Sequence, residues 1–355
     1  MNKNKMEKNT DSMKPLISII ILNYNAGNLL IDCVSSIQKS DYTNFEIILV
    51  DNISKDNSHK KCKDSFPTIK LIENKENLGY CEGNNIGIKS ANGEYIIILN
   101  PDTEVESNWI EEFIKEFNNH GDGLYQPKLL AVSDKSRINS AGNMMNIFGF
   151  GFSSGKGKKD SKKFGNFKPI NYASGACLFT SKKILDKIGL FDPYLFAYHD
   201  DLELGWRALQ LGIKSFYVPT VIVYHAESFS FKWSSKKFYL LERNRWYCIL
   251  THYSKSTFYK ILPGLIIVEI IMILYFLSKG MLKEKIQVLK DLIKDRKLIK
   301  KRYNELEKRK IISDKKIIEE FSNFIEVPSE VSNSSSSKLF NKIINFLGNI
   351  TKKII

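Results

Sequence analysis

The first hundred residues alternate between short, almost wholly apolar runs and segments whose apolar residues recur at helical spacing. The apolar runs are rich in β-branched residues and lie at 17–22, 45–50, 69–72 and 95–99. Runs of this length and composition are typical of strands that are buried on both faces of a parallel sheet. The helical segments lie between them, over 29–37, around 60–63 and near 83–90. This alternation predicts an α/β domain built on a doubly wound sheet.

The pattern weakens after residue 118, where long apolar runs become few. Residues 149–157 are glycine-rich, and residues 156–163 carry five lysines in eight positions. We therefore expect a mobile, solvated loop over 149–168. The alternative is an acceptor-site loop that orders when a ligand binds.

Polar side chains follow three of the predicted strands, at the point where each strand ends. They are Asn23-Tyr24-Asn25, Asp51-Asn52 and Asn100-Pro101-Asp102. Taken singly, each cluster could simply supply turn or helix-capping residues. Because ligands bind beyond the carboxyl ends of strands in such sheets, three coincident clusters predict a ligand site at one sheet edge.

Asp102 is the candidate metal ligand in this set. Mg²⁺ and Mn²⁺ commonly bind through one or two carboxylates plus the phosphates of a substrate. His225 ends a predicted strand over 215–224 and could add an imidazole, which Mn²⁺ tolerates better than Mg²⁺. A histidine with a purely structural role is the alternative at this position.

A second acidic cluster opens a predicted helix that runs to about residue 212. It consists of Asp200, Asp201 and Glu203, and Trp206-Arg207 follow one turn later. The helix dipole alone would favour acidic residues here. One of the carboxylates could instead act as a general base, in which case the three should divide their roles, since they cannot all face one way. Arg207 would then lie beside the same pocket and could pair with a phosphate.

Several other classes of protein are not indicated. The chain has no dinucleotide fingerprint, no phosphate-binding P-loop, no nucleophilic serine or cysteine motif, and no nucleic-acid-binding signature. The five cysteines are scattered, without a zinc spacing, which favours reduced thiols in a cytosolic setting.

Together these motifs resemble family 2 glycosyltransferases with the GT-A nucleotide-sugar-binding fold, especially their rhamnosyltransferase-like branch. The resemblance covers about residues 16–250. It is carried by Ser18 to Asn25, Val50 to Ser54, Asn77-Leu78-Gly79 with Gly83-Asn84-Asn85, Leu99 to Thr103, Ser174-Gly175-Ala176, Phe191-Asp192, Phe196 to Asp201, Trp206-Arg207 and Tyr224-His225.

The resemblance implies roles for these residues. Asp201 matches the catalytic base, Asp102 the metal ligand and His225 the accessory metal ligand. The residues that would border the donor are Asn23, Tyr24, Asn25, Asp51, Asn77, Gly79, Asn84 and Asn100. Asp200, Trp206 and Arg207 would border the acceptor or the diphosphate. Two positions depart from the usual family pattern, since Asn100 replaces the first acid of a DxD motif and Asp200 replaces a glutamate.

The implied reaction transfers a sugar from a nucleotide-diphosphate donor, UDP or dTDP, to an acceptor hydroxyl with inversion of the anomeric carbon. Mg²⁺ or Mn²⁺ would be the cofactor. A non-catalytic, membrane-anchored scaffold on a degenerate transferase domain is the alternative. The sugar, the linkage and the oligomeric state stay open.

Charge separates the chain into two parts. The net charge is 53 − 39 = +14 overall, but residues 251–355 alone hold 21 basic and 11 acidic residues, a net of +10. The basic excess therefore surrounds the apolar tail and favours an anionic membrane over nucleic acid as its partner.

The tail contains an apolar run, Ile261 to Ser278, that is long enough to span a bilayer. Glu269 interrupts the run and would be costly at the centre of a bilayer. Residues 279–310, which follow the run, hold 13 basic and 5 acidic residues, so they favour the cytosolic side, where the domain before the run is also expected. We therefore expect an interfacial or shallow re-entrant helix, with a true span or a buried core helix as alternatives. A second amphipathic helix is predicted at 339–353, after a serine-rich linker at 332–337.

These observations predict four parts. Residues 1–14 form a disordered leader, 15–250 the GT-A domain, 251–331 a basic, helical membrane-associated region, and 332–355 the linker and last helix. We expect a peripheral or monotopic enzyme at the cytoplasmic face of the cell membrane, acting on a lipid-linked saccharide.

Overall fold

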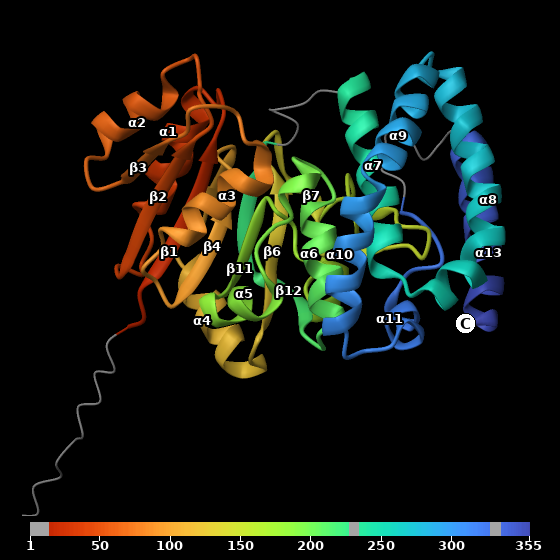
Figure 1. The fold of residues 1–355 in the computed structure, drawn as a ribbon. Helices are drawn as coiled ribbons and strands as arrows, with labels where there is room; N and C mark the ends of the chain where they lie inside the picture. Colours follow the sequence, from red (N-terminus) through yellow and green to blue (C-terminus); the bar gives the residue numbers. More distant parts are fainter. Residues whose placement is uncertain (1–13, 227–233, 327–334) are drawn as a thin grey trace, which may run out of the picture.

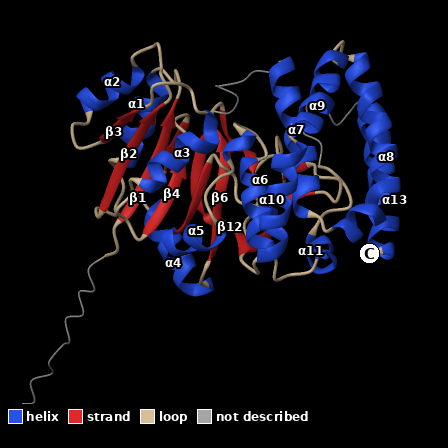
Figure 2. Cartoon of the chain, in the orientation of Figure 1, coloured by secondary structure: helices blue, strands red, loops and turns tan. Residues whose placement is uncertain are grey.

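A mixed sheet of ten strands forms the centre of the protein, in a computed structural model that describes residues 14–226, 234–326 and 335–355 (Figures 1 and 2). Its main path runs in the order β10 (Lys168–Ile170), β12 (Lys214–His225), β6 (Gly123–Ala131), β11 (Cys177–Ser181), β4 (Tyr95–Leu99), β1 (Ile17–Asn23), β2 (Phe45–Asp51) and β3 (Lys70–Glu73). Two strands pair off this path: β5 (Thr103–Val105) with β12, and β7 (Asp134–Ser140) with β6. The α/β prediction is confirmed.

The N-terminal half of the sheet is parallel and covered on both faces. Ile19 on β1 contributes to the cluster under α1 (Asn28–Ile37), whereas Ile20 packs with the cluster that contains Ile88 of α3 (Gly79–Lys89). Because successive strand residues face opposite sides, a strand buried on both sides needs apolar residues at every position. This explains the unbroken run of isoleucines in β1.

The other half contains an antiparallel strand, which makes the sheet mixed rather than purely parallel. Strand β11 runs antiparallel to both β4 and β6, and β12 returns parallel to β6. The short β5 pairs antiparallel with the end of β12, so that Thr103 lies opposite His225. Of the remaining helices, α2 (Ser58–Ser65) packs beside α1 in the parallel half, whereas α4 (Trp109–His120), α5 (Lys182–Ile188) and α6 (Asp200–Gln210) belong to the mixed half.

The expectation of a mobile, solvated loop over residues 149–168 is wrong. The segment contains β9 (Gly151–Ser153), which pairs with β8 (Asn143–Met145), and a short 3-10 turn at Lys162–Phe164. Phe152 and Phe164 are buried, and the Tyr217 hydroxyl donates to the Phe164 carbonyl at 2.9 Å. Two aromatic anchors thus fix a segment whose polar composition concealed them.

The C-terminal helices stand at one side of the sheet, beyond β10 and β12 (Figure 1). They are α7 (Ser235–His252), α8 (Lys255–Ser278), α9 (Leu282–Lys294), α10 (Arg296–Arg309), α11 (Asp314–Glu320) and α13 (Ser335–Ile354). Helix α7 crosses residue 250, so no break in the helical structure falls at the border expected there. Residues 1–13 of the predicted leader and residues 332–334 of the serine-rich linker lie outside the described residues, whereas Lys14 is described and pairs with Glu111 at 3.0 Å.

Helix α8 has one packed face and one exposed apolar face. Ile261 and Val268 are buried in the core, whereas Ile270 and Leu274 are 54% and 59% exposed. Among the described residues, α8 is the one helix long and apolar enough to cross a membrane, by length and composition alone. A wholly buried core helix is therefore not what this segment forms.

Glu269 does not belong to the exposed face of α8. Its carboxylate pairs with Arg245 of α7 at 3.0 Å and with Lys285 of α9, and it accepts from Trp246 Nε1 at 3.1 Å. The acidic residue that interrupts the apolar run thus faces the protein, and the outer stripe of α8 remains apolar.

Candidate functional site

A cavity of about 400 Å³ lies over the carboxyl ends of β1 and β4. Its far side is formed by residues 196–202, and the first two turns of α7 contribute Lys237 and Leu241. The edge predicted from the strand-end clusters is therefore where the cavity opens. Eight of the predicted site residues line it: Tyr24, Asn77, Gly79, Asn100, Asp102, Asp200, Asp201 and His225.

Strand pairing brings Asp102 and His225 together. Asp102 directly precedes β5 and His225 ends β12, so the antiparallel register places the two side chains side by side, with His225 Nε2 3.4 Å from Asp102 Oδ1. The other ring nitrogen of His225 lies 3.3 Å from Asn139 Oδ1, which orients the imidazole. Neither side chain is more than about a tenth exposed.

This donor set fits a divalent cation. One carboxylate and one imidazole, with the Asn100 amide nearby in the same cavity, leave positions for phosphate oxygens, as Mg²⁺ and Mn²⁺ require. Within the described parts of the chain, no group of three or more His, Cys, Asp or Glu side chains is arranged to hold a metal by itself.

The acidic pair stands at the first turn of α6 and lines the same cavity. Asp201 accepts from the Gly175 N–H at 3.1 Å and from the Leu202 N–H at 2.8 Å. Burial raises the pKa of Asp201 above its usual range. Burial, followed by the neighbouring Asp201 charge, raises the pKa of Asp200 well above its usual value. These environments favour a protonated Asp200 beside an Asp201 whose carboxylate keeps two N–H donors.

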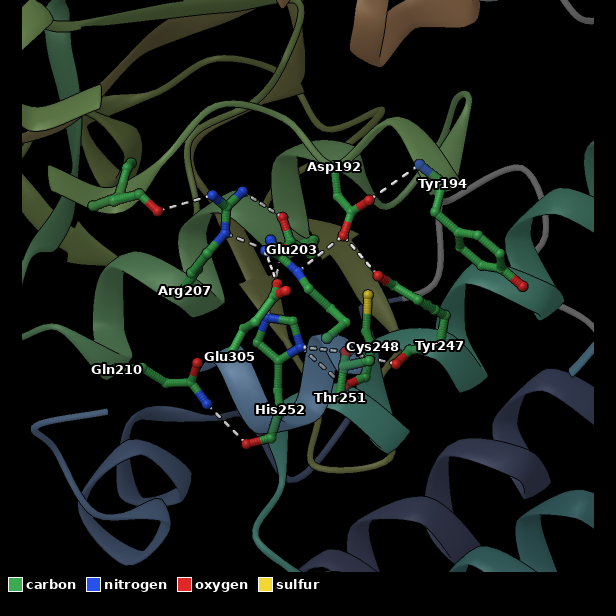
Figure 3. A network of polar contacts seen from close by, with 12 residues as sticks. Asp192, Tyr194, Glu203, Arg207, Gln210, Tyr247, Cys248, Thr251, His252 and Glu305 are labelled. Carbon is green, nitrogen blue, oxygen red and sulfur yellow. Dashed lines mark hydrogen bonds and ion pairs between the residues drawn. The ribbon is translucent and has the colours of Figure 1, made fainter. Parts of the chain in front are cut away.

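Glu203 does not line the cavity, in agreement with the prediction that the three acidic residues cannot all face one way. It is fully buried and receives two hydrogen bonds from Arg207, at 3.0 and 2.6 Å (Figure 3). Arg207 lowers the pKa of Glu203 far below its usual range, against the effect of burial. Glu203 is thus a structural carboxylate.

The prediction that Trp206 and Arg207 border the acceptor or diphosphate is wrong. Trp206 is buried among the rings of His252, Tyr253 and Phe321, and Arg207 is committed to Glu203 and to the Ile188 carbonyl. With about 100° of rotation per residue, both project from the side of α6 that faces the C-terminal helices.

Four predicted donor-binding residues lie behind the lining of the cavity. Asn23 donates to Asp51 at 2.8 Å, and Asp51 also accepts from the Ser54 N–H. Asn84 donates to the Tyr80 carbonyl, and Asn25 accepts from the Lys55 N–H. Because their side chains hold the segments that form the wall, this geometry gives no support to direct donor contact by Asn23, Asn25, Asp51 and Asn84.

Gly79 has a structural reason to be glycine. Its φ is +76°, and a Cβ atom there would lie 2.5 Å from both the ring and the carbonyl oxygen of Phe196. The N-terminus of α3 can therefore approach the 196–199 loop only without a side chain at this position.

Sequence reasoning missed several residues of the wall. Tyr80 donates to the Gly175 carbonyl at 2.6 Å, while Tyr172, Lys237 and Leu241 also line the cavity. Lys237 and Leu241 carry no local motif, and the break before α7 gives no sign that this helix returns to the site.

Residues 18–189, which include the strands on either side of the cavity, match the model of the family described as "Glycosyl transferase family 2". These residues form a family 2 glycosyltransferase domain. The wider chain is similar to a "Low-salt glycan biosynthesis hexosyltransferase Agl10" of Haloferax volcanii, with 27% identity over 68% of this chain and 77% of the relative. It is also similar to an "N-acetylglucosaminyl-diphospho-decaprenol L-rhamnosyltransferase" of Mycobacterium tuberculosis, with 22% identity over 61% of this chain and 78% of the relative.

The fold of this glycosyltransferase is that of GT-A enzymes. The structure of GalNAc-T7 with UDP, GalNAc and Mn²⁺ superposes with a TM-score of 0.56 at 19% identity. The match covers 71% of this chain and about half, 51%, of that protein. The resemblance to family 2 glycosyltransferases with the GT-A fold is thus confirmed, for the family by the match over residues 18–189 and for the fold by this superposition.

Proposed function

We propose that this glycosyltransferase transfers a sugar from a nucleotide-diphosphate donor to an acceptor hydroxyl, with inversion, in the synthesis of a cell-surface glycan. The single observation that carries the proposal is the cavity itself. The Asp102–His225 pair, Asp201 and the strand-end polar residue Asn100 all line it. The relatives' names, which include a hexosyltransferase and a rhamnosyltransferase, support the reaction class.

The donor side would be formed by Tyr24, Asn77 and Asn100. Tyr24 is 38% exposed at the rim, where its ring can lie along a nucleobase. UDP or dTDP is the nucleotide we propose, and the UDP in the GalNAc-T7 structure supports UDP.

Asp102 and His225 would hold Mg²⁺ or Mn²⁺. When bound there, the cation would neutralise charge that builds up on the leaving diphosphate. The chain's own contribution is to keep the Asp102 carboxylate and the Nε2 atom of His225 on one side of the cavity, with Nδ1 of the ring turned towards Asn139.

Asp201 would act as the general base. Its carboxylate faces the cavity and would accept the proton of the acceptor hydroxyl as the oxygen attacks the anomeric carbon. The N–H groups of Gly175 and Leu202 fix the carboxylate in place. Asp200, whose pKa is raised further, would be held neutral, which leaves one ionised carboxylate and favours a single displacement.

The acceptor would be a lipid-linked saccharide, and the enzyme would work at the cytoplasmic face of the cell membrane as a peripheral or monotopic protein. Three features support this location: the exposed apolar face of α8, the exposed Leu339 and Phe346 on α13, and the net charge of +10 over residues 251–355. Helices α8 and α13 lie together at the edge of the molecule farthest from β3 (Figure 1). The decaprenol-linked substrate in the name of the mycobacterial relative is consistent with such an acceptor.

A donor screen tests the proposal. Purified full-length protein is incubated with UDP-, dTDP- and GDP-sugars, with Mn²⁺ or with chelator, and release of the nucleoside diphosphate is measured. We expect metal-dependent release from a UDP- or dTDP-sugar, absent in the Asp201→Asn variant. Neither binding nor turnover of any nucleotide sugar in the presence of metal would reject the proposal in favour of a scaffold.

A further inference from the structure

The loop that leads into the acidic pair has an unusual backbone. Phe196, Tyr198 and His199 have φ angles of 64°, 67° and 59°, in the left-handed region. For residues other than glycine this conformation costs roughly 1–2 kcal/mol each. All three residues line the cavity, and Asp200 follows directly. Other parts of the protein must therefore hold the loop in this form.

Asn244 of α7 is the first element that holds it. Its side chain is fully buried, and Nδ2 lies 2.9 Å from the Leu195 carbonyl, 2.9 Å from that of Ala197 and 2.7 Å from that of Tyr198. An amide nitrogen carries two hydrogens, so the three carbonyls share them. The same loop is held by Arg243, whose Nη2 donates to the Tyr194 and Leu195 carbonyls at 2.8 and 3.0 Å. One turn of α7 thus fixes the backbone up to the start of α6.

Arg302 of α10 is the second element. Its Nε lies 3.0 Å from Asp192 Oδ2, and its Nη2 lies 3.3 Å from Glu203 Oε1. Asp192 also accepts from the Tyr247 hydroxyl at 2.6 Å and caps the Tyr194 N–H (Figure 3). One guanidinium from the C-terminal helices therefore ties the segment before the loop to the helix after it.

Because of the position of Glu203 on α6, its contact with Arg302 also fixes the orientation of Asp201. Glu203 follows Asp201 by two residues, so the two side chains project from opposite sides of the helix, about 200° apart. Glu203 is bound by Arg207, Arg302 and, at 3.5 Å, His252. Any rotation of α6 that moved Asp201 would break these buried contacts.

We propose that Asn244 and Arg302 are positioning residues for transfer, and that the C-terminal helices complete the catalytic unit in addition to any role at a membrane. The inference rests on the proposed role of Asp201 as base. Neither residue touches the cavity; both act through the 195–199 loop and α6.

Four variants test this in the full-length protein. Asn244→Asp keeps the shape of the side chain but removes the donors to the three carbonyls. Arg302→Gln removes the charge while Glu203 keeps Arg207, so the fold should survive. Arg302→Lys restores the charge, and Arg296→Ala, at the exposed start of α10, is the matched control.

With the nucleotide sugar found in the screen, we expect kcat to fall about 10- to 100-fold in Asn244→Asp and Arg302→Gln, the size of effect that a misplaced catalytic group produces. KM for the nucleotide sugar should stay within about twofold, because the donor wall is unchanged. Arg302→Lys should recover part of kcat, and Arg296→Ala should match the wild type.

A wild-type kcat in a folded Arg302→Gln protein would overturn the inference. So would a loss of kcat no larger than the unfolded fraction of the variant, as measured by thermal melting. Amide hydrogen exchange over 194–203 gives a readout independent of turnover. Faster exchange is expected in both test variants. Unchanged exchange would show that Asn244 and Arg302 do not hold the 195–199 loop. This result does not depend on whether Asp201→Asn supports the assignment of Asp201 as base.

Discussion

The imidazole Nε2 of His225 lies 3.4 Å from the carboxylate of Asp102, although the two residues are far apart in the sequence. The three-residue strand β5 creates this contact, because its pairing with β12 places Thr103 opposite His225. Either residue alone would be an ordinary strand-end side chain. Together they offer one carboxylate and one imidazole to a divalent cation, which would take its other ligands from phosphate and water.

Removing one of these ligands should remove metal dependence before it removes the fold. In His225→Ala we expect Mn²⁺-dependent binding of UDP to weaken at least about tenfold, because of the proposed pair of metal ligands only Asp102 remains. Isothermal titration with UDP, with and without Mn²⁺, measures this. Asn139→Ala should produce a smaller loss, because it only frees the imidazole to rotate. Equal metal-dependent affinity in His225→Ala and wild type would contradict the assignment.

Asp201→Asn should abolish transfer while leaving donor binding in place. The substitution keeps the size of the side chain and one acceptor oxygen but removes the basic carboxylate, so kcat should fall by about a hundredfold or more. Initial rates with the identified donor and the KM for that donor are the measurements. Asp186→Asn, a carboxylate on α5 outside the cavity, is the control. A folded Asp201→Asn protein that transfers at the wild-type rate would reject Asp201 as base.

His199 should make the protein less stable in mild acid. Burial lowers the pKa of His199 to about 4 in the folded protein, where the neutral ring contacts the Gly149 carbonyl at 3.2 Å, near the charged Arg245 and Glu242. The unfolded chain has a pKa near 6.5 and takes up a proton first. Stability from this group is therefore complete above about pH 6.5 and declines as the pH falls towards 4, by on the order of 3 kcal/mol.

Thermal unfolding between pH 4 and pH 7 measures this loss. The variant His199→Asn is suited to the comparison, because asparagine tolerates the left-handed backbone and does not titrate. Its melting temperature should fall less than that of the wild type over this range. Parallel curves for the two proteins would show that other groups dominate.

Trp206→Ala should destabilise the protein without changing its affinity for the donor. The indole is completely buried against three rings, so its removal leaves a cavity worth about 3–5 kcal/mol of stability. Chemical denaturation gives the free energy of unfolding. The KM for the donor, measured at low temperature where the variant stays folded, shows whether the donor site is changed. A raised donor KM in a protein of unchanged stability would restore the rejected role of Trp206 at the diphosphate.

The exposed face of α8 should determine attachment to lipid. Ile270→Asp with Leu274→Asp places two charges on this face, which should reduce binding to vesicles containing phosphatidylglycerol at least about tenfold. Co-sedimentation at low and high salt is the measurement. Ile311→Asp, an exposed apolar residue outside α8, controls for added charge. Unchanged binding in the double variant would exclude α8 as the lipid contact.

The sequence predicted the parallel strands well because their signal is local. A strand buried on both faces is apolar at most positions, and residues 17–22, which are apolar except for Ser18, show that pattern openly. Strand β6 was missed for a related reason. It is buried along almost its whole length, yet it includes Gln126 and Lys128, whose polar groups are satisfied by Ser140, the Ser174 N–H and Asp160.

The candidate site residues that lie at the ends of strands or at the start of a helix could be predicted from the sequence. Those whose position depends on how helices pack could not. Asp102, Asp201 and His225 each follow or open an element that the sequence makes visible. Trp206 and Arg207 were misplaced because a helix has two faces, and which face meets the cavity is decided by Phe321 and His252, far along the chain. Asn244 has no local signal, since its partners are backbone carbonyls.

Helix α7 has a practical consequence for anyone who wishes to separate the transferase from its tail. A truncation at residue 250 would cut the helix near its end and remove Arg302, and a truncation before Asn244 would also remove the amide that braces the 195–199 loop. The resulting protein would lose its catalytic geometry together with its lipid affinity, and the two losses could not be told apart. A soluble, active enzyme should instead be sought by replacing exposed apolar residues of α8 with polar ones while the whole chain is retained.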